Sequence, residues 1–248
     1  MHGLRFAFGT LSVLRVRVER WDRASARRAM LTAPLVGLLL GALAGALGAA
    51  ANWRGGPLLA AVLAVAVPAA LTRGLHLDGL ADVADGLGSG KPAQDALRIM
   101  KQSDIGPFGV LTLLLVMLGQ IACFAGQFAI STERGALAAL TAAVAGRCAL
   151  GWGCRRSVPA ARPGGLGAMV AGTVPLSGAL GVSLLSASVL ALIGGHARFA
   201  LALTLGQLAA VALLRRCERR FGGVTGDVLG AMVETASTAA LLALALGP

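Results

Sequence analysis

The chain has 248 residues, of which 56% are hydrophobic and only 13% charged, and its mean hydropathy is +0.78. A soluble domain averages about 25% charged residues, so this composition excludes an ordinary soluble protein. The net charge of +11 does not indicate nucleic-acid binding, because arginine and lysine gather at the ends of apolar segments rather than along one face or tail.

Apolar segments recur along the chain, each near the ~20 residues that a helix needs to cross the hydrocarbon core. They cover residues 33–51, 57–75, 108–130, 136–153, 169–194, 197–214 and 228–246. The pattern predicts an all-α, polytopic transmembrane bundle of about seven spans, folded as one domain over residues 1–248. We expect no secretory signal peptide, because residues 1–30 combine many arginines with no compact apolar core.

Positive charge predicts the orientation of these spans. The segment before the first span contains 7 arginine and lysine residues. The six connections that follow, counted with the adjoining ends of the spans, contain 1, 4, 1, 4, 1 and 4. This alternation is what the positive-inside rule predicts for seven spans and a cytoplasmic N-terminus. The longer connections 72–107, 154–168 and 215–227 then lie in the cytoplasm, and we expect the chemistry there.

An acidic stripe follows the second span. Asp78, Asp82 and Asp85 stand at i, i+4 and i+7, so a helix continuing from that span would carry all three carboxylates on one face. Like charges this close favour a bound cation, and hard oxygen ligands favour Mg²⁺, Mn²⁺ or Ca²⁺. The alternative is a solvated acidic loop with helix caps. His76, beside the stripe, is either a packing residue or a direct contact to a ligand.

The segment after the stripe contains further polar candidates. The glycine-rich run 86–91 does not match a P-loop, because only three residues separate the outer glycines and Pro92 follows Lys91. Residues 92–102 are typical of a short interfacial helix, with Lys101 near its polar side. Asp104 either caps the third span or completes the metal site.

Two later segments complete the candidate site. Arg147, near the end of the fourth span, is a guanidinium suited to phosphate. Gly222 and Gly223, before Thr225, would present amide groups to an anion, or would form a tight turn between two helix caps. Asp227 and Glu234 share a helical face. A carboxylate as deep as Glu234 requires a partner, and Arg147 is our candidate.

The order of these motifs resembles the cobalamin synthase family, which contains adenosylcobinamide-GDP ribazoletransferases. The resemblance covers most of the chain, although Phe6–Val13 lacks the Thr-Arg-Leu-Pro pattern of many members. It rests on His76-Leu-Asp-Gly-Leu-Ala-Asp-Val-Ala-Asp-Gly86, Ile99-Met-Lys-Gln-Ser-Asp-Ile-Gly-Pro-Phe-Gly109, Ala161-Arg-Pro-Gly-Gly-Leu-Gly167 and Gly222-Gly-Val-Thr-Gly-Asp227 with Glu234.

The resemblance implies a multi-pass enzyme of the bacterial cytoplasmic (inner) membrane that requires Mg²⁺. Such an enzyme joins adenosylcobinamide-GDP to α-ribazole or its 5′-phosphate and releases GMP. We hypothesise that Asp78, Asp82 and Asp85, with Asp104, hold Mg²⁺. Lys101 and Arg147 would stabilise negative charge in the transition state, and Asp85 would accept the hydroxyl proton.

Two other functions remain open on the sequence. Asp82-Val-Ala-Asp85-Gly86 matches the opening of the CDP-alcohol phosphotransferase signature, but its later residues are missing at the expected distances. A membrane transporter is the second alternative, although the spans show no clear inverted repeat. Lipid surrounds the chain in every case, and the sequence leaves open whether it forms a homo-oligomer.

Overall fold

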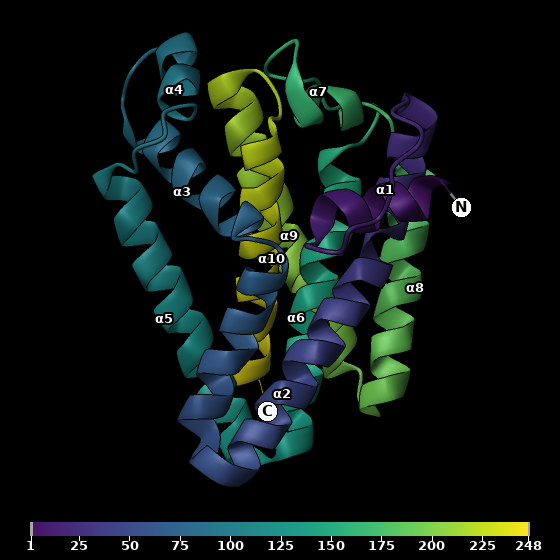
Figure 1. Ribbon diagram of the computed structural model, residues 1–248, viewed down its shortest axis with the longest axis vertical. Coiled ribbons are helices and arrows are strands. Elements are labelled where there is room, and N and C mark those ends of the chain that lie inside the picture. The colour runs from purple at the N-terminus through teal and green to yellow at the C-terminus, as the bar shows by residue number, and fades with distance from the viewer. Residues whose placement is uncertain (1, 248) are drawn as a thin grey trace.

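The computed structural model describes residues 2–247 and contains only helices as regular elements in that range. Six of them are long and apolar enough to cross a membrane, namely α2, α5, α6, α8, α9 and α10. They stand side by side in Figure 1, which confirms the predicted all-α polytopic bundle. The bounds are α1 His2–Leu11, α2 Arg23–Leu71, α3 Leu75–Gly88, α4 Ala93–Ile99, α5 Pro107–Ile130, α6 Thr132–Gly153, α7 Gly165–Val170, α8 Leu176–Gly194, α9 Arg198–Phe221 and α10 Gly226–Leu246.

Helix α2 contains the first two predicted spans in one broken element. Its backbone leaves the helical region at Gly56, where φ is 79°, and Pro57 follows. The helix turns back at this point, at the lower end of the bundle in Figure 1. A Cβ on Gly48 would lie 3.3 Å from the carbonyl oxygen of Ala60, so the two arms of α2 pack together beside the turn.

The predicted fifth span is wrong at its start. Residues 169–175 are not part of the long helix, because Gly172 has φ 68° and Pro175 caps the helix that follows. Val174 instead donates a backbone hydrogen bond to Cys154. Short helix α7 precedes this break, and only α8 is long enough to span.

Small residues allow the centre of the bundle to pack closely. A Cβ on Gly37 of α2 would lie 2.6 Å from the carbonyl oxygen of Ala143 in α6, and one on Gly45 would lie 3.0 Å from that of Ala136. The backbones of α2 and α6 therefore touch, as the spacing of Gly37, Gly41 and Gly45 indicates.

The acidic stripe lies on a separate helix, contrary to the prediction that it continues the second span. Left-handed conformations at Arg73 (φ 55°) and Gly74 (φ 68°) end α2 and let α3 start in a new direction. Helix α3 then runs obliquely across the bundle toward α4 in Figure 1. Helix α4 itself confirms the predicted short helix, with narrower bounds.

Glycines bring α3 and α10 into backbone contact. A Cβ on Gly79 would lie 2.7 Å from the carbonyl oxygen of Asp227, and one on Gly230 would lie 3.2 Å from the Cα of His76. The crossing therefore places the acids of α3 next to the start of α10.

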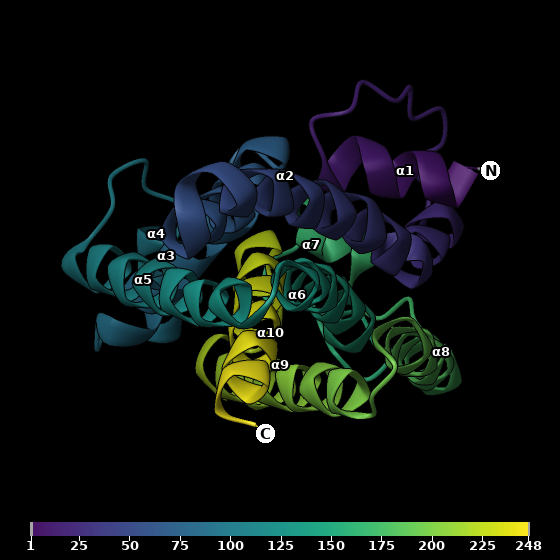
Figure 2. The same ribbon diagram turned by 90° about the horizontal axis from the view of Figure 1, so that it is seen from below.

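The N-terminal segment forms a helix that the sequence did not predict. Figures 1 and 2 show α1 running crosswise to the long helices, along one side of α2. Phe6 and Ala7 anchor it because both are fully buried. The end of α1 thus comes close to the turn that separates α2 from α3, where Val13 donates a backbone hydrogen bond to Leu71.

Candidate active site

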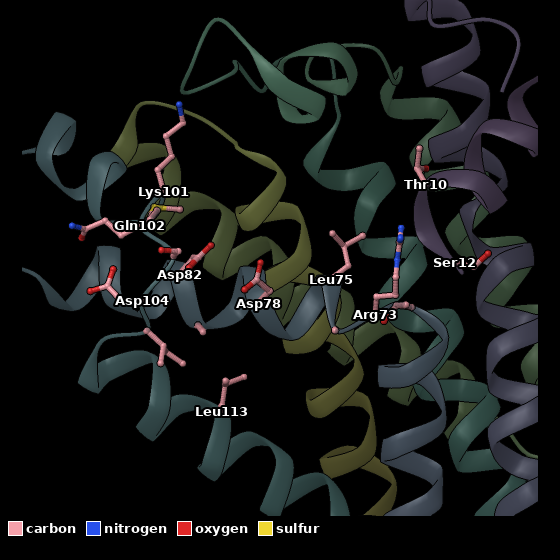
Figure 3. Close-up of a pocket in the computed structure, with 16 residues that line it drawn as sticks. Thr10, Ser12, Arg73, Leu75, Asp78, Asp82, Lys101, Gln102, Asp104 and Leu113 are labelled. Atoms are coloured by element: carbon pink, nitrogen blue, oxygen red, sulfur yellow. The ribbon is translucent and has the colours of Figure 1, made fainter. Parts of the chain in front are cut away.

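Two large cavities open beside α3. The first, which we call the polar cavity, has a volume of about 740 Å³ and is shown in Figure 3. Helix α3 forms one wall, the segment between α4 and α5 another, and the end of α1 a third. The polar side chains on its walls are Thr10, Ser12, Thr72, Arg73, Asp78, Asp82, Lys101, Gln102, Ser103 and Asp104.

The second cavity, which we call the apolar cavity, has a volume of about 720 Å³. Its walls are largely aliphatic side chains and glycines, contributed by α1, α2, α6, the 163–170 segment and α10. Leu11, Met30, Leu150, Pro163, Leu166, Val170, Val224 and Leu229 form the apolar part, and Arg162, Thr225 and Asp227 form a polar part. Leu75, Asp78 and Lys101 line both cavities, so the cavities meet at α3.

Asp78 and Asp82 lie where negative charge accumulates. Figure 3 shows both side chains on the side of α3 that faces the segment carrying Lys101. Burial raises the pKa of Asp82 to about 7, with further contributions from Asp227, Asp78 and Asp85. A cation bound here would relieve this repulsion, and the donors are hard oxygens, so the residues fit Mg²⁺ held by one or two carboxylates together with substrate phosphates.

Asp85 does not share this environment, although it belongs to the same stripe. It is only 7% exposed, and its two oxygens accept hydrogen bonds from the backbone amides of Gly106, at 2.8 Å, and Gly109, at 2.9 Å. These amides begin α5, so the carboxylate satisfies donors that a helix start leaves unpaired. Both oxygens are engaged, and Asp85 lines neither cavity. We therefore withdraw it as proton acceptor and metal ligand.

This contact explains why residues 106 and 109 of the Ile99–Gly109 motif are glycines. A Cβ on Gly106 or on Gly109 would lie 2.5 Å from a carboxylate oxygen of Asp85. Helix α5 has Gly106 as its N-cap without a side-chain cap, so the first of the two interpretations of Asp104, as a cap of the third span, is wrong. Asp104 is exposed and lines the polar cavity instead.

The predicted cluster of four carboxylates is not formed. Within residues 2–247, no three His, Cys, Asp or Glu side chains converge closely enough to hold one metal ion. The reason is that Asp85 turns toward α5, while Asp104 reaches the polar cavity from the segment between α4 and α5. A cation at Asp82 would need oxygens from the substrate.

Two further basic or titratable side chains line these cavities. Lys101 borders both cavities from the segment after α4. His76 is 3% exposed and lines the apolar cavity, and its Nε2 has no hydrogen-bond partner among the described residues. Burial, and then the charge of Arg147, lowers the pKa of His76 well below its ordinary value. The imidazole is therefore neutral at physiological pH.

Arg162 lines the candidate site, although the sequence predicted for it no role beyond the positive charge that orients the spans. Its guanidinium pairs with a carboxylate oxygen of Asp227 at 2.7 Å, and both side chains line the apolar cavity. The same carboxylate oxygen accepts a hydrogen bond from the Thr225 hydroxyl. The sequence feature that could have identified Arg162 is its position directly before the Pro-Gly-Gly run at residues 163–165.

The Gly222–Thr225 segment forms a tight turn between two helix caps, which is one of the two structures that the sequence allowed for it. Gly222 caps α9 with φ 80°, and the Thr225 hydroxyl accepts a hydrogen bond from the amide of Val228 at the start of α10. A Cβ on Gly223 would lie 2.3 Å from the carbonyl oxygen of Pro159. Gly222 and Gly223 line neither large cavity, whereas Thr225 does. We do not retain anion binding by the two glycines.

Arg147 and Glu234 lie deeper in the bundle, away from both large cavities. They border a small cavity of about 50 Å³ together with Gln120 and Ser237. The Gln120 side-chain amide donates to Glu234 at 3.1 Å. Within the described residues no direct ion pair joins Arg147 and Glu234, but both line this one small cavity, so their partnership stays a prediction. Neither residue lines either of the two large cavities that Asp78 borders, and their predicted catalytic roles stay predictions.

The family model described as cobalamin-5-phosphate synthase matches residues 3–245. The chain is 44% identical to an adenosylcobinamide-GDP ribazoletransferase of Frankia casuarinae, over 98% of the chain and 94% of the relative. It is 45% identical to one of a Nocardioides species, over 97% of both, and 39% identical to one of Sinorhizobium medicae over 76% of the chain and 74% of the relative. No solved structure gives a significant match.

Proposed function

The chain belongs to the cobalamin-5-phosphate synthase family, and we propose that its transfer reaction takes place where the polar and apolar cavities meet. The protein is an adenosylcobinamide-GDP ribazoletransferase. It joins adenosylcobinamide-GDP to α-ribazole, or to its 5′-phosphate, and releases GMP. The family and the named relatives support this activity over a CDP-alcohol phosphotransferase or a transporter.

The reaction is a displacement at phosphorus. A ribose hydroxyl oxygen of α-ribazole forms a bond to the phosphorus that carries the cobinamide. The bond from that phosphorus to the bridging oxygen breaks, and its electron pair leaves with GMP. The hydroxyl proton must pass to a base. Attacking and leaving oxygens lie roughly in line in such a displacement, so α-ribazole and the departing GMP lie on opposite sides of the phosphorus.

One observation supports placing the reaction where the two cavities meet. Asp78 and Lys101 line both cavities, and no other charged side chains of the described chain do so. An acceptor in one cavity and a diphosphate in the other would therefore both reach a carboxylate and an ammonium group. We assign Asp78 as the base, in place of Asp85, because its carboxylate borders both substrates. Lys101 stabilises the negative charge that develops on the phosphoryl oxygens.

Asp82 is our choice for the carboxylate that holds Mg²⁺. It lines the polar cavity one helical turn from Asp78, and its charged form is disfavoured by burial and neighbouring acids. When bound, the ion would neutralise charge on the diphosphate. The protein itself holds Asp82 in place through the packing of α3 on α5 and α10, which Asp85 and Gly79 make possible.

The orientation in the membrane belongs to the same proposal. Positive charge alternates between the connections so that the segments carrying Lys101, Arg162 and Arg220 share one side. We place that side in the cytoplasm of a bacterial cell, where nucleotides are found.

Purified protein in detergent, supplied with Mg²⁺, adenosylcobinamide-GDP and α-ribazole, tests the activity directly. We expect GMP and the joined product to appear in equal amounts, and chelation of the divalent cation to stop both. Formation of GMP without the joined product would mean that water, rather than α-ribazole, reaches the phosphorus, and would contradict the proposal.

A further inference from the structure

The two cavities differ in chemistry, and we infer that they bind different substrates: the apolar cavity takes the base and ribose of α-ribazole, and the polar cavity takes the diphosphate end of adenosylcobinamide-GDP. This assignment rests on the proposed function. It adds which substrate occupies which side of Asp78, and which residues select each one.

The apolar cavity matches a flat base with few polar atoms. The base of a ribazole is a benzimidazole, so its recognition depends mainly on removing apolar surface from water. Aliphatic side chains from four parts of the chain surround this space, including Leu11, Leu150, Val170 and Leu229. Guanine, with several donors and acceptors on its edge, would leave them unpaired against these walls.

The polar part of the same cavity matches the sugar. Arg162, Thr225 and Asp227 lie together there, joined by the ion pair at 2.7 Å and the hydrogen bond from Thr225. They provide donors and acceptors for ribose hydroxyls, and Arg162 provides a cation for a 5′-phosphate. Asp78 borders the same space, where it can receive the proton of the attacking hydroxyl.

The polar cavity has the opposite character. Arg73 and Lys101 provide positive charge, while Ser103, Gln102 and Thr10 provide hydrogen-bonding groups. Asp82 provides carboxylate oxygens for a cation that accompanies phosphates. Its volume, about 740 Å³, is in the range of a nucleotide-sized ligand, so the much larger corrinoid ring would remain outside.

Two glycines allow the apolar cavity to be filled without disturbing the backbone. Gly164 and Gly226 line it, and a Cβ on either would meet no atom within 4 Å. Gly164 is extended, with φ −128°, and Gly226 is not left-handed, so both positions accept a side chain. Gly164→Leu and Gly226→Leu should therefore fold and reduce the space for the base.

The test measures KM for each substrate separately with the detergent-purified full chain. We expect Gly164→Leu and Gly226→Leu each to raise KM for α-ribazole about tenfold or more, with KM for adenosylcobinamide-GDP unchanged. Arg73→Gln, on the polar cavity only, should raise KM for adenosylcobinamide-GDP alone. Gly181→Leu is the matched control, because Gly181 also has open space around it but lies in α8, away from both cavities. It should change neither KM.

The opposite pattern, in which the two leucine variants raise KM only for adenosylcobinamide-GDP, would reverse the assignment. Unchanged KM values in both leucine variants would show that the apolar cavity binds neither substrate. Equilibrium dialysis of α-ribazole against the unmodified protein adds a measurement independent of turnover: binding should persist in excess GDP, and displacement by GDP would overturn the inference. Failure of the unmodified protein to join the substrates would contradict the proposed function itself, which separates the two outcomes.

Discussion

The carboxylate of Asp85 in α3 accepts a hydrogen bond from the backbone amide of Gly109 in α5, at 2.9 Å. Its second oxygen accepts from Gly106, so one side chain ties the acidic helix to the start of a membrane-spanning helix. This contact separates Asp85 from Asp78 and Asp82, with which it forms a single stripe in the sequence. Asp85 thus positions α3, and our proposal assigns the chemistry to Asp78 and Asp82.

Asp85→Asn should mainly lower stability. The amide has only one acceptor oxygen, so one backbone N–H of α5 loses its partner and faces an NH₂ group, which we expect to cost about 1–3 kcal/mol. Thermal unfolding in detergent measures this loss. Asp95→Asn is the control, because it removes one carboxylate charge whose ion pair with Arg98 in α4 is exposed to solvent, so the midpoint should change little. A variant with an unchanged midpoint and abolished turnover would return Asp85 to the reacting atoms.

Cation binding should depend on pH through Asp82. In the cation-free protein its pKa is raised to about 7, so the carboxylate is protonated below that pH, and a cation must displace the proton. The apparent affinity for Mg²⁺ should therefore fall as pH drops below about 7. Isothermal titration in buffers of different ionisation enthalpy would detect the released proton. An affinity that is constant from pH 8 to 5.5 would exclude Asp82 as the ligand.

The raised pKa of Asp82 also predicts how the stability of the cation-free protein changes with pH. The folded state binds the Asp82 proton more tightly than the unfolded state, whose pKa is near 3.8. Stability should therefore be highest at the acid end of this window and fall as pH rises from about 4 to about 7. Asp82→Asn should flatten this dependence, whereas Asp95→Asn should preserve it.

Arg147 and Glu234 should couple weakly rather than as a direct ion pair. Both border the cavity of about 50 Å³, whose volume suits an ordered water that would join their charges. We expect Arg147→Ala and Glu234→Ala each to lower stability, and the double variant to be less than additive by about 0.5–1 kcal/mol. Additive losses in the double-mutant cycle would show that the two residues do not interact, and Gln120 would then be the principal partner of Glu234.

The orientation can be measured with a reporter that is active only outside the cytoplasm. Fusions after Lys91 or Arg220 should be silent, and fusions after Arg54 or Arg134 should be active, because the connections alternate in positive charge. An active fusion after Lys91 would place both cavities outside the cytoplasm.

Hydrophobic runs were sufficient to predict the helical bundle, because a membrane accepts little other than helices for such segments. The division of α2 into two arms also followed from the sequence, since Arg54, two glycines and Pro57 interrupt an otherwise continuous run. The break at Arg73 and Gly74 was missed although Thr72, Arg73 and Gly74 interrupt the apolar run, because a polar residue near the end of a predicted helix does not show whether the helix continues or starts again in a new direction.

The candidate site was predicted only in part, because helical periodicity gives a face without saying what covers that face. Asp78, Asp82 and Asp85 share a face, but α5 covers the last of them. Arg162 and the end of α1 were missed because their importance depends on contacts between distant segments. Thr10 and Asp104, far apart in the sequence, border one cavity only after the chain has folded.

The rate of the isolated Asp78→Asn variant tests the central claim that the reaction occurs at Asp78, between the two cavities. At saturating Mg²⁺ and both substrates, removal of the base should lower kcat by about 10²–10⁴-fold, with an unfolding midpoint and both KM values close to those of the unmodified protein. The Asp82→Asn variant should differ, because excess Mg²⁺ should restore part of its rate. An Asp78→Asn enzyme that keeps more than about a tenth of the unmodified kcat, equivalent to a barrier change below about 1.4 kcal/mol, would contradict the account.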